Sequence, residues 1–117
     1  MYYVKKFTTL RELHLQENMI TALGMKMLAN GKTEFHKNMS ILYLWGNQLE
    51  NDGLKYMKSF ENLTELYLFR NEIETEGVRH LVKEPLKKLK KLDLSIFCFS
   101  IVYNKIDTSG AKQLAKL

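Results

Sequence analysis

The side chains that could perform catalysis or bind a metal ion do not form a recognisable pattern in this sequence. His14, His36 and His80 lie far apart along the chain, and no pair has the close spacing of metal ligands. Cys98 is the only thiol, so it is the only candidate for a thiol nucleophile. The glycines do not cluster into a loop that could hold a phosphate. We therefore expect no catalytic residue, no metal, no cofactor and no small-molecule substrate.

The densest charge in the chain is a run of lysines between residues 83 and 91. The run carries a local charge of +4, which is most of the net charge of +5. A solvated turn tolerates such charge without any function, and this interpretation is favoured. The alternative is that the lysines attract nucleic acid, an acidic membrane surface or an acidic protein. The members of this basic patch are Lys83, Lys87, Lys88, Lys90 and Lys91.

Aromatic residues occupy alternate positions in two short segments. Tyr43 and Trp45 form one pair, Tyr67 and Phe69 form the other, and Arg70 follows directly. Alternate residues of a strand project from the same face. Aromatic and arginine side chains dominate binding interfaces, where a hot spot contributes about 2 kcal/mol or more. The alternative is that these rings only stack across strands, which stabilises a sheet by about 0.2–1 kcal/mol per pair.

An internal repeat must position these side chains. It is anchored on four asparagines, and leucine stands three and five residues before each of the first three. Isoleucine or leucine follows two residues after every anchor, and glycine follows six residues after. The anchors are Asn18, Asn47, Asn71 and Asn104. Four copies in phase exclude a chance pattern and indicate a stack of similar units.

Each position of the repeat has a physical interpretation. Leucines at a spacing of two predict one face of a short strand. The asparagine follows where the chain leaves the strand, and its amide can bond backbone groups that the turn leaves unpaired. The spacing then becomes helical, and Ile73, Val78 and Leu81 predict one helix face. The glycine is expected to let this helix approach the neighbouring unit closely.

Three polar residues stand where helix N-caps are expected. They are Asn51, Thr75 and Thr108, each of a type that bonds the backbone N–H groups at the start of a helix.

The register resembles the ribonuclease-inhibitor type of leucine-rich repeat, L-x-x-L-x-L-x-x-N-x-L followed by x-x-x-G-x-x-x-L. The resemblance extends from Leu10 to Leu114. It implies an α/β fold, a right-handed solenoid of about four repeats with parallel strands on the concave side and helices on the convex side. We predict a single domain over 1–117, with repeats at about 10–38, 39–62, 63–88 and 89–117.

The resemblance implies a binding surface on the concave side. The residues between the buried leucines of each strand would point outward there. We predict a protein partner, held by eight concave residues: His14, Gln16, Tyr43, Trp45, Tyr67, Phe69, Arg70 and Asp93.

The fourth repeat is interrupted by seven residues, 96–102. Without them the regular sequence Leu-Asp-Leu-Ser-Tyr-Asn-Lys-Ile would remain. One interpretation is a genuine loop whose apolar residues form a partner site or an aggregation hazard. The other is a gene-model artefact, because the codons of this segment can be written with an internal GT…AG intron. Sequencing the mature transcript distinguishes the two.

The location is predicted from what the sequence lacks. The first residues have no apolar run of a secretory signal, and the longest apolar run is far below the roughly 20 residues of a membrane span. A single cysteine favours a reducing compartment. We therefore expect a cytoplasmic or nuclear protein.

The function predicted from the resemblance is recognition rather than catalysis. We expect a protein-binding module, either a fragment of a longer repeat array or a small member of an intracellular recognition or scaffold family. One alternative is a GTPase regulator, because Ran GTPase-activating proteins have similar repeats and act through a loop arginine, here Arg70. Another is a set of accessory repeats from a ubiquitin ligase or a receptor.

Overall fold

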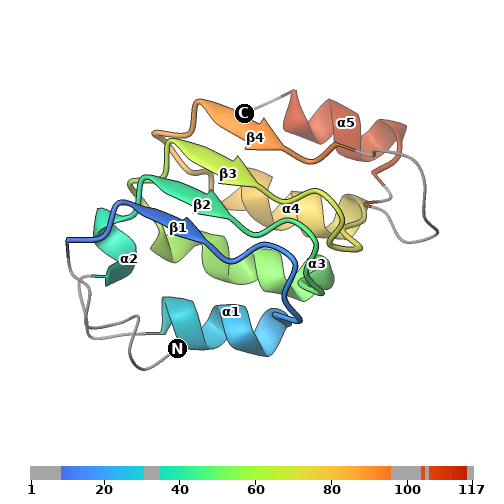
Figure 1. Cartoon of the computed structure of the whole chain (residues 1–117). Coiled ribbons are helices and arrows are strands. Elements are labelled where there is room, and N and C mark those ends of the chain that lie inside the picture. Colours follow the sequence, from blue (N-terminus) through green and yellow to red (C-terminus); the bar gives the residue numbers. More distant parts are fainter. Residues whose placement is uncertain (1–8, 31–34, 96–103, 105, 116–117) are drawn as a thin grey trace.

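The chain folds as a two-layer stack of strands and helices (Figure 1). The computed structural model describes residues 9–30, 35–95, 104 and 106–115. Within these residues four parallel strands form one sheet in the order of the sequence. The strands are β1 (Glu12–His14), β2 (Ile41–Tyr43), β3 (Glu65–Tyr67) and β4 (Lys91–Asp93). Equivalent residues face one another, as Leu13, Leu42, Leu66 and Leu92 do.

The second layer consists of helices that follow each strand along the chain (Figure 1). In the described part of the chain these are α1 (Ala22–Ala29), α2 (Phe35–Asn38), α3 (Glu50–Gly53), the 3₁₀ helix η2 (Leu54–Ser59), α4 (Thr75–Lys83) and α5 (Thr108–Leu114). The short helix α2 has no counterpart before β3. It contains His36, which packs edge-on against Phe60 with ring centroids 6.2 Å apart.

The core lies between the two layers. Leu42 and Leu44 from the sheet are fully buried, and so are Ile73 and Val78 from the helical layer. These are the positions that the two hydrophobic periods predict, and their burial confirms both periods. Each buried leucine contributes roughly 1.5–3 kcal/mol to stability. At the outer strands the equivalent leucines are only partly buried.

The asparagine of each inner repeat connects its own turn to the preceding repeat. The Asn71 Nδ2 donates to the carbonyl of Leu68 at 3.0 Å and to that of Leu44, one repeat earlier, at 2.9 Å. The Asn71 Oδ1 accepts from the Leu49 N–H at 3.3 Å. Asn71 is completely buried, so these bonds replace solvation by water.

The same bonds recur in the neighbouring repeats and form an asparagine ladder. Asn47 donates to Leu15 at 3.0 Å, and Asn104 donates to Leu68 at 3.0 Å. Asn18 differs because no repeat precedes it among the described residues. Its amide donates only within its own turn, to the carbonyls of Leu15 and Gln16. The ladder therefore begins at Asn18 and runs along the stack.

The predicted N-caps are wrong by one or two residues. The N-cap of α4 is Glu74 and that of α5 is Asp107, so Thr75 and Thr108 are the first helical residues. Asn51 lies inside α3.

The polar side chains that were expected to cap their own helices act instead on the following repeat. The Asn51 Oδ1 accepts from the N–H groups of Glu74 at 2.8 Å and Gly77 at 3.0 Å, so it caps α4. Thr75 donates its hydroxyl proton to Asp107 Oδ1 at 2.8 Å. Capping in this fold therefore joins neighbouring repeats.

The repeat glycines make this contact possible. A Cβ atom on Gly77 would lie 2.7 Å from Asn51 Oδ1, and one on Gly110 would lie 2.8 Å from Thr75 Oγ1. Both distances are too short for any side chain. The expectation that glycine permits close approach of a neighbouring unit is confirmed at these two positions.

Asp107 makes the stability of the last repeat depend on pH. The Gly110 N–H and the Thr75 hydroxyl bond its carboxylate and hold the pKa below the usual value. A lowered pKa contributes stability that is present above the unfolded pKa of about 3.9 and is lost as pH falls through the folded pKa.

We expect Asp107→Asn to remove this dependence while keeping a capping oxygen. Urea unfolding at about pH 6 should show the wild type as more stable, and the difference should shrink towards about pH 3. A difference that does not change over this range would show that the Asp107 carboxylate is not held ionised by these bonds.

Candidate protein-binding surface

Aromatic rings form a column across the face of the sheet that is turned away from the helices. Tyr43 stacks on Tyr67 with ring centroids 4.5 Å apart and planes inclined by 8°. His14 stacks on the other side of Tyr43 at 4.2 Å and 15°. Parallel strands lie about 4.8 Å apart, so rings at equivalent positions meet face to face. We call the open face of the sheet that carries Tyr43, Tyr67, Trp45 and Phe69 the ring face.

A second column lies two residues further along the strands. Trp45 stacks on Phe69 with centroids 4.9 Å apart and planes inclined by 9°. Tyr43, Tyr67, Trp45 and Phe69 all remain partly exposed. Stacking between strands therefore occurs as one interpretation of the sequence predicted, and it leaves part of each ring open to a partner.

Charged groups border the first column. The Tyr67 hydroxyl donates to Glu65 Oε2 at 2.6 Å, and the Lys91 ammonium lies 4.9 Å from the centre of the Tyr67 ring. Hydrogen bonding to the Tyr67 hydroxyl raises the pKa of Lys91. Partial burial raises the pKa of Tyr43, and the nearby side chains of Tyr67 and Glu12 act in the same direction. Tyr43 and Lys91 thus keep their protons, and the border carries both signs of charge.

The edge beyond the second column is set by a turn with left-handed backbone. Gly46 has φ of 71°, and the equivalent residues Glu17 and Arg70 have φ of 53° and 57°. Arg70 Nη1 lies 3.6 Å from Glu17 Oε1, although the two belong to the first and third repeats. Gly46 lies between them and has no side chain, which leaves room for this ion pair to cross the middle repeat.

The comparison with known proteins agrees with this geometry. A family model described as leucine-rich repeat matches residues 8–29 and 61–82, and each match contains a strand, its turn and its helix. The fold is a leucine-rich-repeat solenoid. The match and the parallel sheet together confirm the predicted fold class of about four repeats. No curated protein matches the chain.

The solenoid brings together most of the eight predicted concave residues. Six form or flank the two columns: His14, Gln16, Tyr43, Trp45, Tyr67 and Phe69. Arg70 lies at the edge in the ion pair with Glu17, and Asp93 accepts from the Ser95 N–H at the end of β4. Glu65 and Lys91 also belong to this surface, because both stand two residues before a predicted concave position on the same face of a strand.

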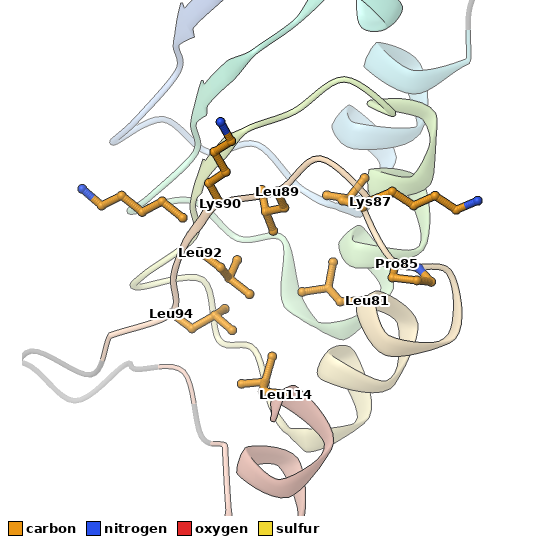
Figure 2. Close-up of a pocket in the computed structure, with 10 residues that line it drawn as sticks. Leu81, Pro85, Lys87, Leu89, Lys90, Leu92, Leu94 and Leu114 are labelled. Atoms are coloured by element: carbon orange, nitrogen blue, oxygen red, sulfur yellow. The ribbon is translucent and has the colours of Figure 1, made fainter. Parts of the chain in front are cut away.

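The lysines of the predicted basic patch extend from the solenoid in several directions. Lys91 belongs to the ring face, whereas Lys88 donates to Asn62 Oδ1 at 2.6 Å. Lys87 and Lys90 extend in different directions from the same turn (Figure 2). Lys83 is the last residue of α4. Residues close in sequence separate here because the chain turns from a helix into a strand.

Two further findings concern only the described part of the solenoid. No group of three or more histidine, cysteine or acidic side chains is placed to hold a metal ion. No helix there is long and apolar enough to cross a membrane. Cys98 and the predicted insert at 96–102 lie outside the described residues.

Proposed function

We propose that this solenoid is a protein-binding module and that the ring face of the second and third repeats holds its partner. The observation that carries the proposal is the pair of ring columns, Tyr43 with Tyr67 and Trp45 with Phe69. Leucine-rich repeats support a protein-interaction role in general. The position of the rings on the open side of the sheet supports the location of the site.

The stacking itself supports binding, because it fixes the rings before a partner arrives. A side chain that is immobilised on binding costs about 0.5–1.5 kcal/mol of ordering. Tyr43 and Trp45 have already lost much of this freedom through contact with Tyr67 and Phe69 of the third repeat. A partner that packs on the rings would therefore gain their contact area at low entropic cost.

The finer features of the protein are also proposals. The ribonuclease-inhibitor subtype is supported by the spacing of the strand leucines, the asparagine and the helix glycine. A cytoplasmic or nuclear location and a role in a recognition or scaffold protein rest on the sequence arguments. No specific observation favours the GTPase-regulator alternative, since the guanidinium of Arg70 is paired with Glu17.

The test is the affinity of an identified partner for ring-face variants. Crosslinking with the chain as bait would identify a partner, and calorimetry would then measure its dissociation constant. We expect Trp45→Ala and Tyr67→Ala each to weaken binding by about tenfold or more, which is about 1.4 kcal/mol.

Lys58→Ala is the control, because Lys58 lies in η2 on the helical side. We expect it to leave affinity unchanged. Urea unfolding of each variant separates lost binding from lost folding. Unchanged affinity in both folded ring-face variants would show that the partner binds elsewhere.

A further inference from the structure

The two ends of the solenoid expose complementary surfaces. We propose that copies of this chain associate head to tail, with the β4 end of one copy against the β1 end of the next. Figure 1 shows β1 and α1 at one end of the stack and β4 and α5 at the other. This association is separate from partner binding and would extend the ring face from copy to copy.

The β4 end carries an apolar hollow of about 560 Å³. Leu81, Leu89, Leu92, Leu94 and Leu114 converge on it, while Lys87 and Lys90 extend outward from its border (Figure 2). Leu92 and Leu94 are the equivalents of Leu42 and Leu44 but are only partly buried. The hollow is therefore the end of the continuous core, left open where inner repeats receive a neighbour.

The β1 end is apolar as well. Leu10 and Leu13 of the first repeat are only partly buried. Leu15 and Ile20 are partly buried too, although their equivalents in the second repeat, Leu44 and Leu49, are fully buried. Apolar surface at both ends can be removed from water if one end covers the other.

The hydrogen bonds of the asparagine ladder fit across such a junction. The carbonyls of Leu15, Leu44 and Leu68 each accept from the asparagine of the following repeat. Leu94 is the next carbonyl in this series, and no asparagine of the described residues donates to it. Asn18 is the one anchor whose amide reaches no preceding repeat. In the proposed association, the amide of Asn18 in a second copy would donate to the carbonyl of Leu94.

The helical layer shows the same fit. Asn51 and Thr75 each contact the first turn of the following helix. Thr108 is the next residue in this series, at the β4 end. At the β1 end, α1 has no side-chain bond at its N-cap, and a Cβ on Gly24 would meet only Ile20. The first turn of α1 is therefore open to Thr108 of a second copy.

The charges of one pair at the junction are complementary. If the register of the sheet continues, Lys91 of one copy lies beside Glu12 of the next, whose Oε1 lies 2.8 Å from His14 Nε2 in its own strand. Opposite charges on directly adjacent strands stabilise the pair, whereas like charges destabilise it. This arrangement favours a second copy of the same chain as the occupant.

A head-to-tail contact uses a different surface on each copy, so it forms an open series unless it closes into a ring. We expect the average mass of the full 117-residue chain, measured by sedimentation velocity, to rise with concentration and to pass beyond that of a dimer. Added salt should weaken the association because exposed charges are screened.

Charge reversal tests the register. Lys91→Glu places two carboxylates at the junction and Glu12→Lys places two ammonium groups there, so each should weaken association about tenfold. The double variant, and an equal mixture of the two single variants, should restore it. Lys58→Glu changes the net charge of the chain as Lys91→Glu does, and it lies in η2 of an inner repeat. It replaces the exposed ion pair with Glu84 inside one copy by two carboxylates, so it should leave association unchanged as long as the chain is folded.

Several results would overturn the proposal. These are a chain that stays monomeric at every concentration, a mass that stops at the dimer, or single reversals that leave association unchanged. Failure of the double variant to restore association would also overturn it. A monomer would indicate that the hollow at the β4 end is covered by a different segment or protein. Circular dichroism confirms that each variant is folded.

Discussion

Asn71→Ala is expected to lower the free energy of unfolding by about 3 kcal/mol or more. The substitution removes one of the two amide donors of the Leu44 and Leu68 carbonyls, which keep Asn47 and Asn104, and it leaves the buried N–H of Leu49 without its side-chain partner. The unsatisfied N–H costs about 1–3 kcal/mol, and each lost bond to a carbonyl costs about 0.5–1.5 kcal/mol. Because small domains are stable by only about 5–15 kcal/mol, this loss is a large share of the total.

Asn18→Ala is the matched control for this prediction. Asn18 occupies the same position in the first repeat, but it is exposed and bonds only its own turn. Water can replace its bonds, so we expect a loss below about 1 kcal/mol. Urea unfolding followed by circular dichroism measures both variants. Equal losses would show that the contact between repeats contributes nothing beyond the turn.

Gly77→Ala is expected to lower the free energy of unfolding by about 2–3 kcal/mol, although alanine forms helix better than glycine. Helix propensity alone would stabilise α4 by about 1 kcal/mol. The new Cβ would lie 2.7 Å from Asn51 Oδ1 and 3.1 Å from Asn51 Cα. Overpacking of this kind costs about 1–3 kcal/mol, and displacing Asn51 also removes a cap worth about 1 kcal/mol.

Gly24→Ala is the control that separates the gain in helix propensity from the cost of the close contact with the neighbouring repeat. A Cβ on Gly24 would meet only the Ile20 side chain, which can shift, so we expect a change of less than about 1 kcal/mol in either direction. In the double variant Gly77→Ala with Asn51→Ala, part of the loss at Gly77 should be absent because the shortest contact is removed. Thermal unfolding of the wild type, the two single variants Gly77→Ala and Asn51→Ala, and the double variant gives the coupling energy between the two positions. Stabilisation by Gly77→Ala would contradict the proposed close approach.

The burial of a residue could be predicted where it depends only on the strand or helix spacing of the apolar residues around it. Leu42 and Leu44 alternate with exposed rings, and Ile73, Val78 and Leu81 follow the helical spacing. Their burial depends only on the face of the element to which they belong. The same alternation placed Tyr43 and Trp45 on the open side of the sheet.

Contacts between repeats could not be predicted from the spacing within one repeat. Asn51 and Thr75 have the residue types of N-caps and stand near helix starts. Their partners lie more than twenty residues away in the next repeat. The distance between stacked repeats decides which N–H group each oxygen reaches. The sequence pattern within one repeat gives no information about this distance.

The lysines show the same limit. Lys90 and Lys91 are adjacent in sequence, but consecutive residues at the start of a strand point to opposite sides. Lys91 consequently joins the ring face and contacts Tyr67, one repeat earlier. Lysines that are close in sequence can point in different directions when the chain passes from a helix through a turn into a strand.

The asparagine ladder also determines how such a protein can change length during evolution. Every inner unit receives an amide from the unit after it and donates one to the unit before it. Duplication or deletion of a whole unit therefore recreates the interfaces that already exist. Asn104 donates to the Leu68 carbonyl although seven more residues separate it from its strand than separate the other anchors from theirs, so added residues at this place leave the ladder intact.

Variation in length also occurs on the return from helix to strand. The first two asparagine spacings are 29 and 24 residues, and the longer one contains α2 on the return from helix to strand. Genetic events that add or remove residues in this return path leave the turn and its bonds intact. The molecule can thus be inherited as whole units joined by segments that are free to drift in length.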